Sequence, residues 1–209
     1  MGRYLGPVCR LCRREGMCLS LKGKRSLTGK CGIVRITLPP GQHGQRRIKM
    51  TPYGRQLREK QRMKRVYGML EGQFRQTFGR AERMKGVTGE NLLALLERRL
   101  DRIVYRLGFA ATQAEARQLV THGHIVVNGG KLDRPSAVLR PGAVVEVREK
   151  SRGLERINEA LDDALRQGIR SWVELDRGAY RGTLKSLPER QELTTPSFEE
   201  HLVVEHYSK

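Results

Sequence analysis

The chain has 209 residues, of which 41 are Lys or Arg and 22 are Asp or Glu, so its net charge is +19 at pH 7. This excess is larger than solubility requires and indicates a polyanionic partner. The longest apolar run is Leu92 to Leu96 and the first residues lack the apolar stretch of a signal peptide, which disfavours a membrane or secreted protein.

The excess charge is concentrated at one end of the chain. Residues 1–90 hold 22 Lys and Arg against 5 Asp and Glu, whereas the remainder holds 19 against 17. This asymmetry is typical of a nucleic-acid-binding part joined to an ordinary globular part. We expect a cytoplasmic protein, in which the four cysteines are thiols or metal ligands rather than disulfides.

The first 50 residues contain all four cysteines and show no sustained helical or strand period. Cys9 and Cys12 are spaced to bind one side of a tetrahedral ion, and Cys18 and Cys31 can complete it. A metal crosslink would also give this segment, which has little core of its own, a reason to fold. We predict zinc, with an iron–sulfur cluster as the less favoured alternative.

Three helices are expected next. The first spans residues 53–67 and carries a cationic row, which we expect to serve binding rather than folding. The second spans residues 71–84 and buries Phe74, Phe78 and Ala81. The third spans residues 90–107 and carries a second row beside its leucine stripe. The rows consist of Arg55, Arg58, Arg62 and Arg65 in the first helix, and Arg99, Arg102 and Arg106 in the third.

The following segment predicts a short helix and a hairpin. Thr112 and Glu115 form a capping box, Gly123 ends the helix, and the turn at Asn128 and Gly129 joins two strands. Further strands are expected at 143–149, in "WVELD", in "GTLKSL" and in "HLVVEHY", and an amphipathic helix at 154–167. Trp172 is interpreted as a core residue rather than a stacking platform.

Catalytic motifs are missing from the sequence. It contains no G-x-x-x-x-G-K-[ST] loop, no G-x-G-x-x-G after a strand and no G-x-S-x-G elbow. The "EEH" at 199–201 lies in a charged tail that predicts no pocket. The pattern therefore indicates a binding protein rather than an enzyme. Because few aromatic residues are available to stack on bases, recognition of a folded RNA by its shape and phosphates is favoured.

Several motifs resemble the family of small-subunit ribosomal protein four. They are "LERRLDRIVYRLGFAATQAEARQLVTHGHIVVNG" at 96–129, "PPGQHGQ", "REKQRMKRVYG" and "LVVEHYSK", in that order. The resemblance implies an α+β fold: a helical N-terminal domain with a Cys-rich extension, plus an RNA-binding module of helices and a small twisted antiparallel sheet. It divides the chain into an extension (1–50), a helical domain (51–96, completed by about 190–209) and the module (97–189).

The resemblance also implies a function and partners. It implies a primary binder of a multi-helix junction in the 5′ domain of small-subunit ribosomal RNA, which nucleates assembly and influences translational accuracy. The implied neighbours are small-subunit proteins five and three and the messenger RNA where it enters the subunit. The candidate RNA-binding residues, some from this signature and some from the cationic rows, are Arg3, Arg10, Arg13, Arg14, Arg46, Arg47, Arg55, Arg58, Arg62, Lys64, Arg65, Arg98, Arg99, Arg117, His122, His124 and Asn128.

One departure concerns the metal. Metal-binding members of the family have a cysteine where this chain has Ser26, so Cys18 must reach the ion by another loop path. Alternatively, Cys18 is an ordinary apolar residue and His43 is a ligand. Two other functions remain open: an RNA-modifying enzyme of the pseudouridine synthase type that uses the same module, and a zinc-stabilised DNA-binding factor. The first needs a catalytic domain and the second a recognition helix, and neither is evident.

Overall fold

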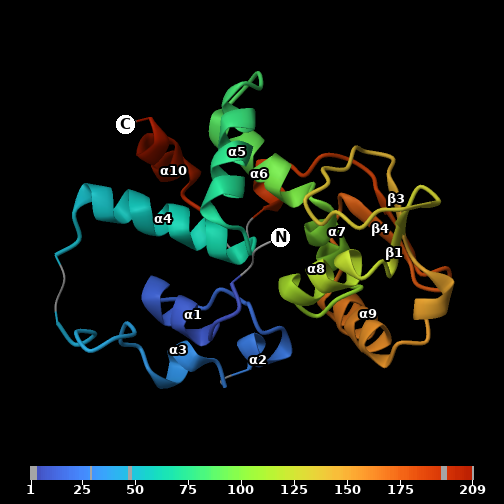
Figure 1. Ribbon diagram of the computed structural model, residues 1–209, viewed down its shortest axis with the longest axis horizontal. Helices are drawn as coiled ribbons and strands as arrows, with labels where there is room; N and C mark the ends of the chain where they lie inside the picture. The colour runs from blue at the N-terminus through green and yellow to red at the C-terminus, as the bar shows by residue number, and fades with distance from the viewer. Residues whose placement is uncertain (1–3, 29, 47–48, 194–196, 209) are drawn as a thin grey trace. The chain divides into compact units, whose positions relative to one another are not determined.

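The computed structural model describes the whole chain except residues 1–3, 29, 47–48, 194–196 and 209. The chain forms two compact units (Figure 1). One, here called the terminal unit, comprises Met1–Leu92 and Thr194–Lys209, and the other, the inner unit, comprises Leu93–Leu193. The boundaries expected from the sequence, at 50, 96 and about 190, stay a prediction, but the mixed fold class with a small antiparallel sheet is confirmed.

The Cys-rich extension contains three short helices, which the sequence pattern did not predict. They are α1 (Cys9–Glu15), α2 (Lys24–Leu27) and α3 (Gly32–Arg35). Helix α1 ends at Gly16, which has a left-handed φ of 70° and satisfies carbonyls of the last turn. The buried residues of this segment are Cys12, Leu19 and Cys31, so the cysteines themselves form most of its small core.

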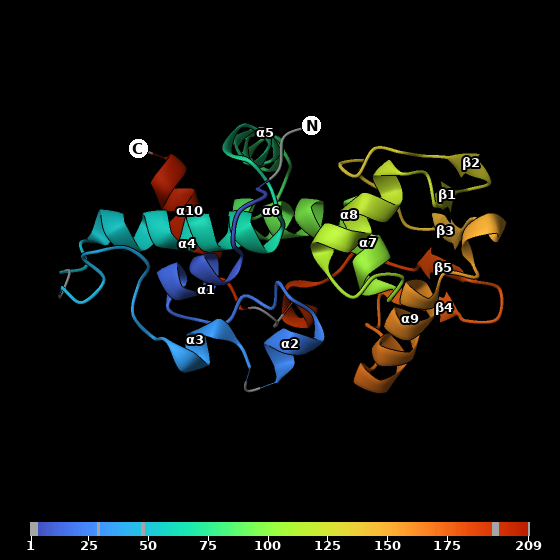
Figure 2. The ribbon, with the colours of Figure 1, turned by 60° about the horizontal axis from the view of Figure 1, so that its bottom comes forward.

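Three more helices lie in the described part of the terminal unit, which also contains the start of α6 (Thr88–Glu97). They are α4 (Pro52–Val66), α5 (Glu71–Glu82) and the C-terminal α10 (Glu200–Tyr207). Thr51 caps α4 by accepting a hydrogen bond from the Gly54 amide at 3.0 Å, and Pro52 occupies the first turn. Helix α10 packs across α4 (Figures 1 and 2), and the buried Met63, Phe74, Phe78 and Val203 belong to the core of this unit.

The strand expected in "HLVVEHY" was wrong, because this segment is helix α10. Its alternation of apolar and polar residues is too short to distinguish a strand from two turns of helix. As a helix, it places Val203 in the core and brings the Tyr207 ring to 4.5 Å from the Phe78 ring, between centroids. Packing on α4 and α5, rather than local propensity, therefore determines its structure.

Glu71 connects three helices of the terminal unit. Its carboxylate accepts hydrogen bonds from Lys60 at 2.7 Å, from Lys64 at 2.8 Å and from the Tyr207 hydroxyl at 2.8 Å. Burial alone would raise the pKa of Glu71, but these donors outweigh it and lower the pKa to about 2. Burial and the neighbouring carboxylate raise the pKa of Tyr207, which keeps its proton for this hydrogen bond.

Acid is expected to weaken this contact. A carboxylate with a depressed folded-state pKa stabilises the fold above its unfolded value of 4.5, and this is lost as pH falls towards about 2. Because the Glu71 side chain is 45% exposed, solvent screening leaves an effect of about 1 kcal/mol. Thermal melts should show Glu71→Gln below the unsubstituted protein at pH 7, with the difference closing towards pH 2. A difference that is independent of pH would contradict this role.

The single helix expected at 90–107 is divided in two, α6 (Thr88–Glu97) and α7 (Leu100–Arg106). At the break, Arg99 is extended and forms a bridge with Val138. The Leu139 amide donates to the Arg98 carbonyl at 2.9 Å, and the Leu100 amide donates to the Ala137 carbonyl at 2.8 Å. Hydrogen bonds to this distant segment replace the helical ones, and the sequence of the helix alone does not reveal them.

Two further α-helices, two 3₁₀ helices and a five-stranded sheet complete the inner unit. Helix α8 (Gln113–Thr121) begins at Thr112, whose hydroxyl accepts from the Glu115 amide at 3.2 Å as expected for a cap. The 3₁₀ helix η1 (Glu149–Ser151) and helix α9 (Glu155–Gln167) follow strand β3, and η2 (Arg190–Glu192) ends the unit. The strands are β1 (Ile125–Val127), β2 (Gly130–Lys131), β3 (Val144–Val147), β4 (Val173–Asp176) and β5 (Arg181–Leu184).

All neighbouring strands are antiparallel, in the order β2-β1-β3-β5-β4. The predicted primed turn is confirmed, because Asn128 and Gly129 have φ values of 49° and 78°. Helix α7 and Ile157 and Leu161 of α9 share one apolar core with the sheet. Trp172, which is 1% exposed, belongs to this core as expected.

Candidate nucleic-acid interface

The cationic row on α4 is only partly available to a ligand. Arg55 is exposed. Arg58 and Arg65 instead form ion pairs with Glu15 of α1, Arg58 at 3.5 Å. Arg62 pairs with Glu59 at 3.1 Å and donates to the Ser197 carbonyl. The expectation that the row plays no part in folding was therefore wrong for three of its four members, because each holds other segments in place, and RNA binding by these residues stays a prediction.

Glu15 is the centre of this arrangement. Its side chain is 2% exposed. Burial raises the pKa of Glu15, although Arg65, Arg58 and Arg14 oppose that effect. The two guanidinium groups of α4 thus favour the ionised form of this buried carboxylate. Burial also lowers the pKa of Arg58. The α1 helix is consequently attached to α4 by charge as well as by packing.

The other predicted cations of the terminal unit are mostly exposed. Arg10, Arg14 and Arg46 lie at the surface, and Lys64 pairs with Glu71. Arg13 donates through Nε to the Leu38 carbonyl at 2.9 Å, so it also holds the chain that follows α3. Arg3 and Arg47 lie outside the described residues.

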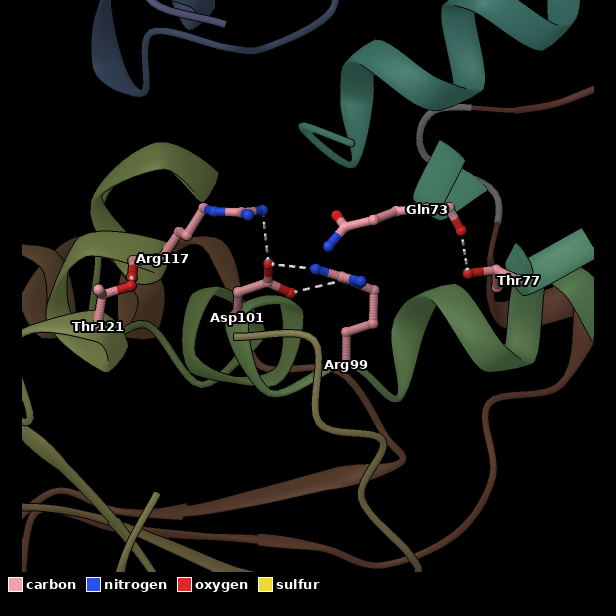
Figure 3. A network of polar contacts seen from close by, with 6 residues as sticks. All are labelled: Gln73, Thr77, Arg99, Asp101, Arg117 and Thr121. Carbon is pink, nitrogen blue, oxygen red and sulfur yellow. Dashed lines mark hydrogen bonds and ion pairs between the residues drawn. The ribbon is translucent and has the colours of Figure 1, made fainter. Parts of the chain in front are cut away.

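In the inner unit, Arg99 and Arg117 are buried on either side of Asp101 (Figure 3). Arg99 binds the carboxylate with both Nε and Nη2, at 3.0 and 2.8 Å, and Arg117 approaches it at 3.7 Å. The Thr121 hydroxyl donates to the Arg117 carbonyl at 2.8 Å. Because Asp101 is 0% exposed, these two arginines neutralise a charge inside the protein, and an RNA-binding role for them stays a prediction.

The prediction of a second cationic row, on the helix expected at residues 90–107, was wrong. Arg102 and Arg106 bind Glu97 at 3.0 and 2.9 Å, and the Glu97 side chain is 1% exposed. Arg170 lies close enough for this cluster to affect it, since burial first and then Arg106 lower the pKa of Arg170. The break between α6 and α7 turns Arg99 away from these two residues, so the three arginines do not form one surface stripe.

The polar residues of the signature mostly support the local fold. His124 shares a hydrogen bond with the Ser151 hydroxyl at 2.8 Å through Nδ1. Asn128 accepts a hydrogen bond from the Val144 amide at 2.8 Å through Oδ1, which fixes the hairpin to the next strand. His122 is exposed at the end of α8. RNA contacts by these three residues are not tested by the geometry.

Arg98 has a partner that the sequence did not indicate. Its Nε donates to the Leu139 carbonyl at 2.8 Å, which fixes the guanidinium beside the exposed Arg140. Burial lowers the pKa of Arg98, and the nearby charge of Arg140 adds to this effect. Two like charges held together form a natural place for a phosphate. Arg140 lies 42 positions after Arg98, and the bridge between Arg99 and Val138, with the hydrogen bonds between Arg98 and Leu139, brings the two together.

The four cysteines are free and occupy one small region of the extension. The Sγ atoms of Cys18 and Cys31 are 3.4 Å apart, and Cys9, Cys12 and Cys31 line one small pocket with Ser26. Burial raises the pKa of Cys12, and the other three cysteines add to it. Within the described residues, however, no three His, Cys, Asp or Glu side chains are arranged to hold a metal ion. His43 is exposed and does not line this pocket.

A highly charged helical unit and a second unit of helices on a small antiparallel sheet define a nucleic-acid-binding protein. Residues 3–97 match the ribosomal protein S4/S9 N-terminal domain and residues 98–145 match the S4 domain. Proteins named small ribosomal subunit protein uS4 are 63% identical in Syntrophotalea carbinolica, 61% in Pelobacter propionicus and 59% in Geobacter sulfurreducens, over the full length of both chains. The chain belongs to the ribosomal protein S4 family.

Among the described residues, no helix has the length and apolar character that a membrane span requires.

Proposed function

We propose that this protein is a structural constituent of the small ribosomal subunit in the cytoplasm, where it binds ribosomal RNA and catalyses no reaction. The observation that carries this proposal is the full-length similarity to proteins named small ribosomal subunit protein uS4, at 57–63% identity. The concentration of positive charge in the first 90 residues supports it, because phosphate contacts provide most of the affinity for nucleic acid. A modifying enzyme is not favoured, since residues 3–97, before the module, match the ribosomal protein S4/S9 N-terminal domain rather than a catalytic domain.

The finer part of the proposal concerns where the protein binds. We infer that it recognises a multi-helix junction in the 5′ domain of the ribosomal RNA, that it nucleates assembly there and that it influences accuracy. Exposed cations on fixed helices suit such a junction, because they meet phosphates of a compact fold with little further ordering. The proposed neighbours are small-subunit proteins five and three, and messenger RNA where it enters the subunit.

Crosslinking in cells, followed by sequencing of the attached RNA, tests this proposal. We expect the crosslinks to gather within the 5′ domain of the small-subunit ribosomal RNA, at segments that meet at one junction. Crosslinks spread evenly over unrelated RNAs would contradict it. Enrichment at pseudouridine positions, together with loss of that modification when the protein is depleted, would favour the enzyme instead.

We also propose that Cys9, Cys12, Cys18 and Cys31 hold one zinc ion. Four thiols in one region of a segment with little apolar core suit a tetrahedral zinc site, which would crosslink α1 to the residues around α3. Cys18 Sγ lies 3.5 Å from the Ser26 carbonyl oxygen, so Cys18 reaches the region where related proteins have their third cysteine. The bound ion would supply structural stability and no chemistry.

Metal analysis and thermal melts of the purified protein test the zinc site. We expect about one equivalent of zinc, and Cys18→Ser should lower both the zinc content and the melting temperature. The double variant Cys18→Ser with Ser26→Cys should recover both, because it returns the fourth thiol to the same region. Less than about a tenth of an equivalent of any transition metal in the unsubstituted protein would remove the proposal.

A further inference from the structure

Helix α5 has one face that none of the sequence motifs explains. Its residues follow one another at spacings of three, one, three, one and three positions, which places their side chains on one side of a helix. They line a single shallow hollow on the protein surface, and they are all Gly, Arg or Gln. The set, here called the α5 face, is Gly72, Arg75, Gln76, Gly79, Arg80 and Arg83.

The opposite side of α5 explains why this face is left outside. Phe74, Phe78 and Ala81 are buried in the core of the terminal unit, which fixes the rotation of the helix. Arg75, Arg80 and Arg83 are consequently exposed. Glu71, at the start of the same helix, is already engaged by Lys60 and Lys64, so its charge is directed away from the face.

The charge of the α5 face is not neutralised within the protein. Arg75, Arg80 and Arg83 form no ion pair in the part of the chain that the structure describes. This distinguishes them from Arg58, Arg62 and Arg65 of α4, which pair with carboxylates. Three unneutralised guanidinium groups on a rigid helix form a surface that fits a polyanion.

The two glycines are not explained by packing inside the protein. A Cβ atom added at Gly72 or at Gly79 would meet nothing within 4 Å. Both residues lie within a regular helix, where glycine is a poor choice because it loses more backbone freedom than other residues. The open space beside them leaves the helix backbone between the arginines accessible to a ligand.

We propose that the α5 face seats the sugar-phosphate backbone of a ribosomal RNA helix, with phosphates bound by Arg75, Arg80 and Arg83 and the backbone lying against Gly79. The inference rests on the proposed function. The face contains no aromatic residue to stack on a base, and Gln76 can donate to or accept from 2′-hydroxyl and phosphate oxygens. From Gly72 to Arg83 the helix rises about 16 Å, which is enough to contact more than one phosphate.

Replacing Gly79 by Leu separates binding from folding. Leucine is a good helix former and the space is open, so the melting temperature should stay the same or rise by a few degrees. The added side chain should nevertheless reduce affinity for a transcript of the 5′ domain of small-subunit ribosomal RNA at least about tenfold. The control is Gly153→Leu, at another exposed glycine with nothing within 4 Å of its added Cβ, which should bind normally.

Charge variants test the phosphate contacts independently. Arg75→Gln with Arg83→Gln should reduce the slope of log affinity against log salt by about 1.4–1.8, since each lost phosphate contact removes roughly 0.7–0.9. Arg156→Gln with Arg166→Gln, two exposed arginines of α9, makes the same change in net charge and should leave the slope unaltered.

The outcomes distinguish this inference from the proposed function. If the unsubstituted protein fails to prefer the ribosomal transcript, the proposed function fails. If it shows that preference but the Gly79→Leu and Arg75/Arg83 variants bind as tightly as their controls, the α5 face does not bind the RNA. The proposed function then still stands. If these variants bind RNA normally but lose an acidic protein from reconstituted subunits, the face belongs to a protein partner, and the inference is overturned.

Discussion

Replacing Asp101 by Ala is expected to lower the free energy of unfolding of the inner unit by about 3–5 kcal/mol. The carboxylate is 0% exposed, and it is the shared partner of Arg99 and Arg117, which are 4% and 8% exposed. Removing it leaves two like charges with little access to water. The loss should be several times that for an ordinary surface charge, because the buried Arg99 loses both of its hydrogen bonds to Asp101 and Arg117 loses a nearby carboxylate.

Denaturant unfolding followed by tryptophan fluorescence provides the measurement. Trp172 is the only tryptophan and lies in the core of the inner unit, so its signal reports on the unit that contains Asp101. Asp133→Ala is the matched control, since it removes the same charge from an exposed position of the same unit. A loss below about 1 kcal/mol for Asp101→Ala would show that water reaches both arginines once the carboxylate is removed.

Replacing Arg58 and Arg65 together by Gln is expected to cost the terminal unit about 2–3 kcal/mol at pH 7. The two arginines are the partners of Glu15, whose side chain is 2% exposed, and their own exposure of 25% and 20% moderates the loss. Burial already raises the pKa of Glu15 while the two arginines are present. Without the arginines this pKa must rise further. The loss should therefore shrink as pH falls below the unfolded-state pKa of about 4.3, because Glu15 then becomes protonated in both the folded and the unfolded protein.

Calorimetric melts of a mutant cycle isolate this effect. The triple variant with Glu15→Gln in addition should regain most of the lost stability at pH 7, because no buried charge remains. Replacing the exposed Arg55 by Gln gives the control for the loss of one charge from α4. If the double and triple variants melt together at every pH, Glu15 does not depend on these arginines.

Elements with a clear period were predictable from the sequence. Helices α4, α5, α8 and α9 and strands β1 to β5 lie where apolar spacing and turn residues placed them, within a few positions. Errors arose where distant segments decide the local structure. The break at Arg98 and Arg99 depends on hydrogen bonds to residues 135–139, and α10 is helical because it packs on α4. In both cases the residues that determine the local structure lie far away in the sequence, so a short window of sequence cannot predict it.

The same limit applies to the cationic residues, because the sequence does not show which of them pair with carboxylates. The excess charge and its concentration in the first 90 residues were evident from composition. The sequence did not reveal which arginines remain available for RNA. Their ion pairs with Glu15, Glu97 and Asp101 form only when the chain is folded. The α5 face could have been found from its helical spacing, since Arg75, Gln76 and Gly79 lie on one side while Phe74 and Phe78 mark the other.

We propose that fixed cationic faces of this protein bind a folded ribosomal RNA. The most direct measurement is the affinity of the purified full chain for a transcript of the 5′ domain of small-subunit ribosomal RNA, compared with an unrelated duplex of equal length, over a range of salt concentrations. We expect at least about tenfold preference for the transcript at physiological salt, and an affinity that falls steeply as salt rises. Equal affinity for the two RNAs, or an affinity that does not change with salt, would contradict the account.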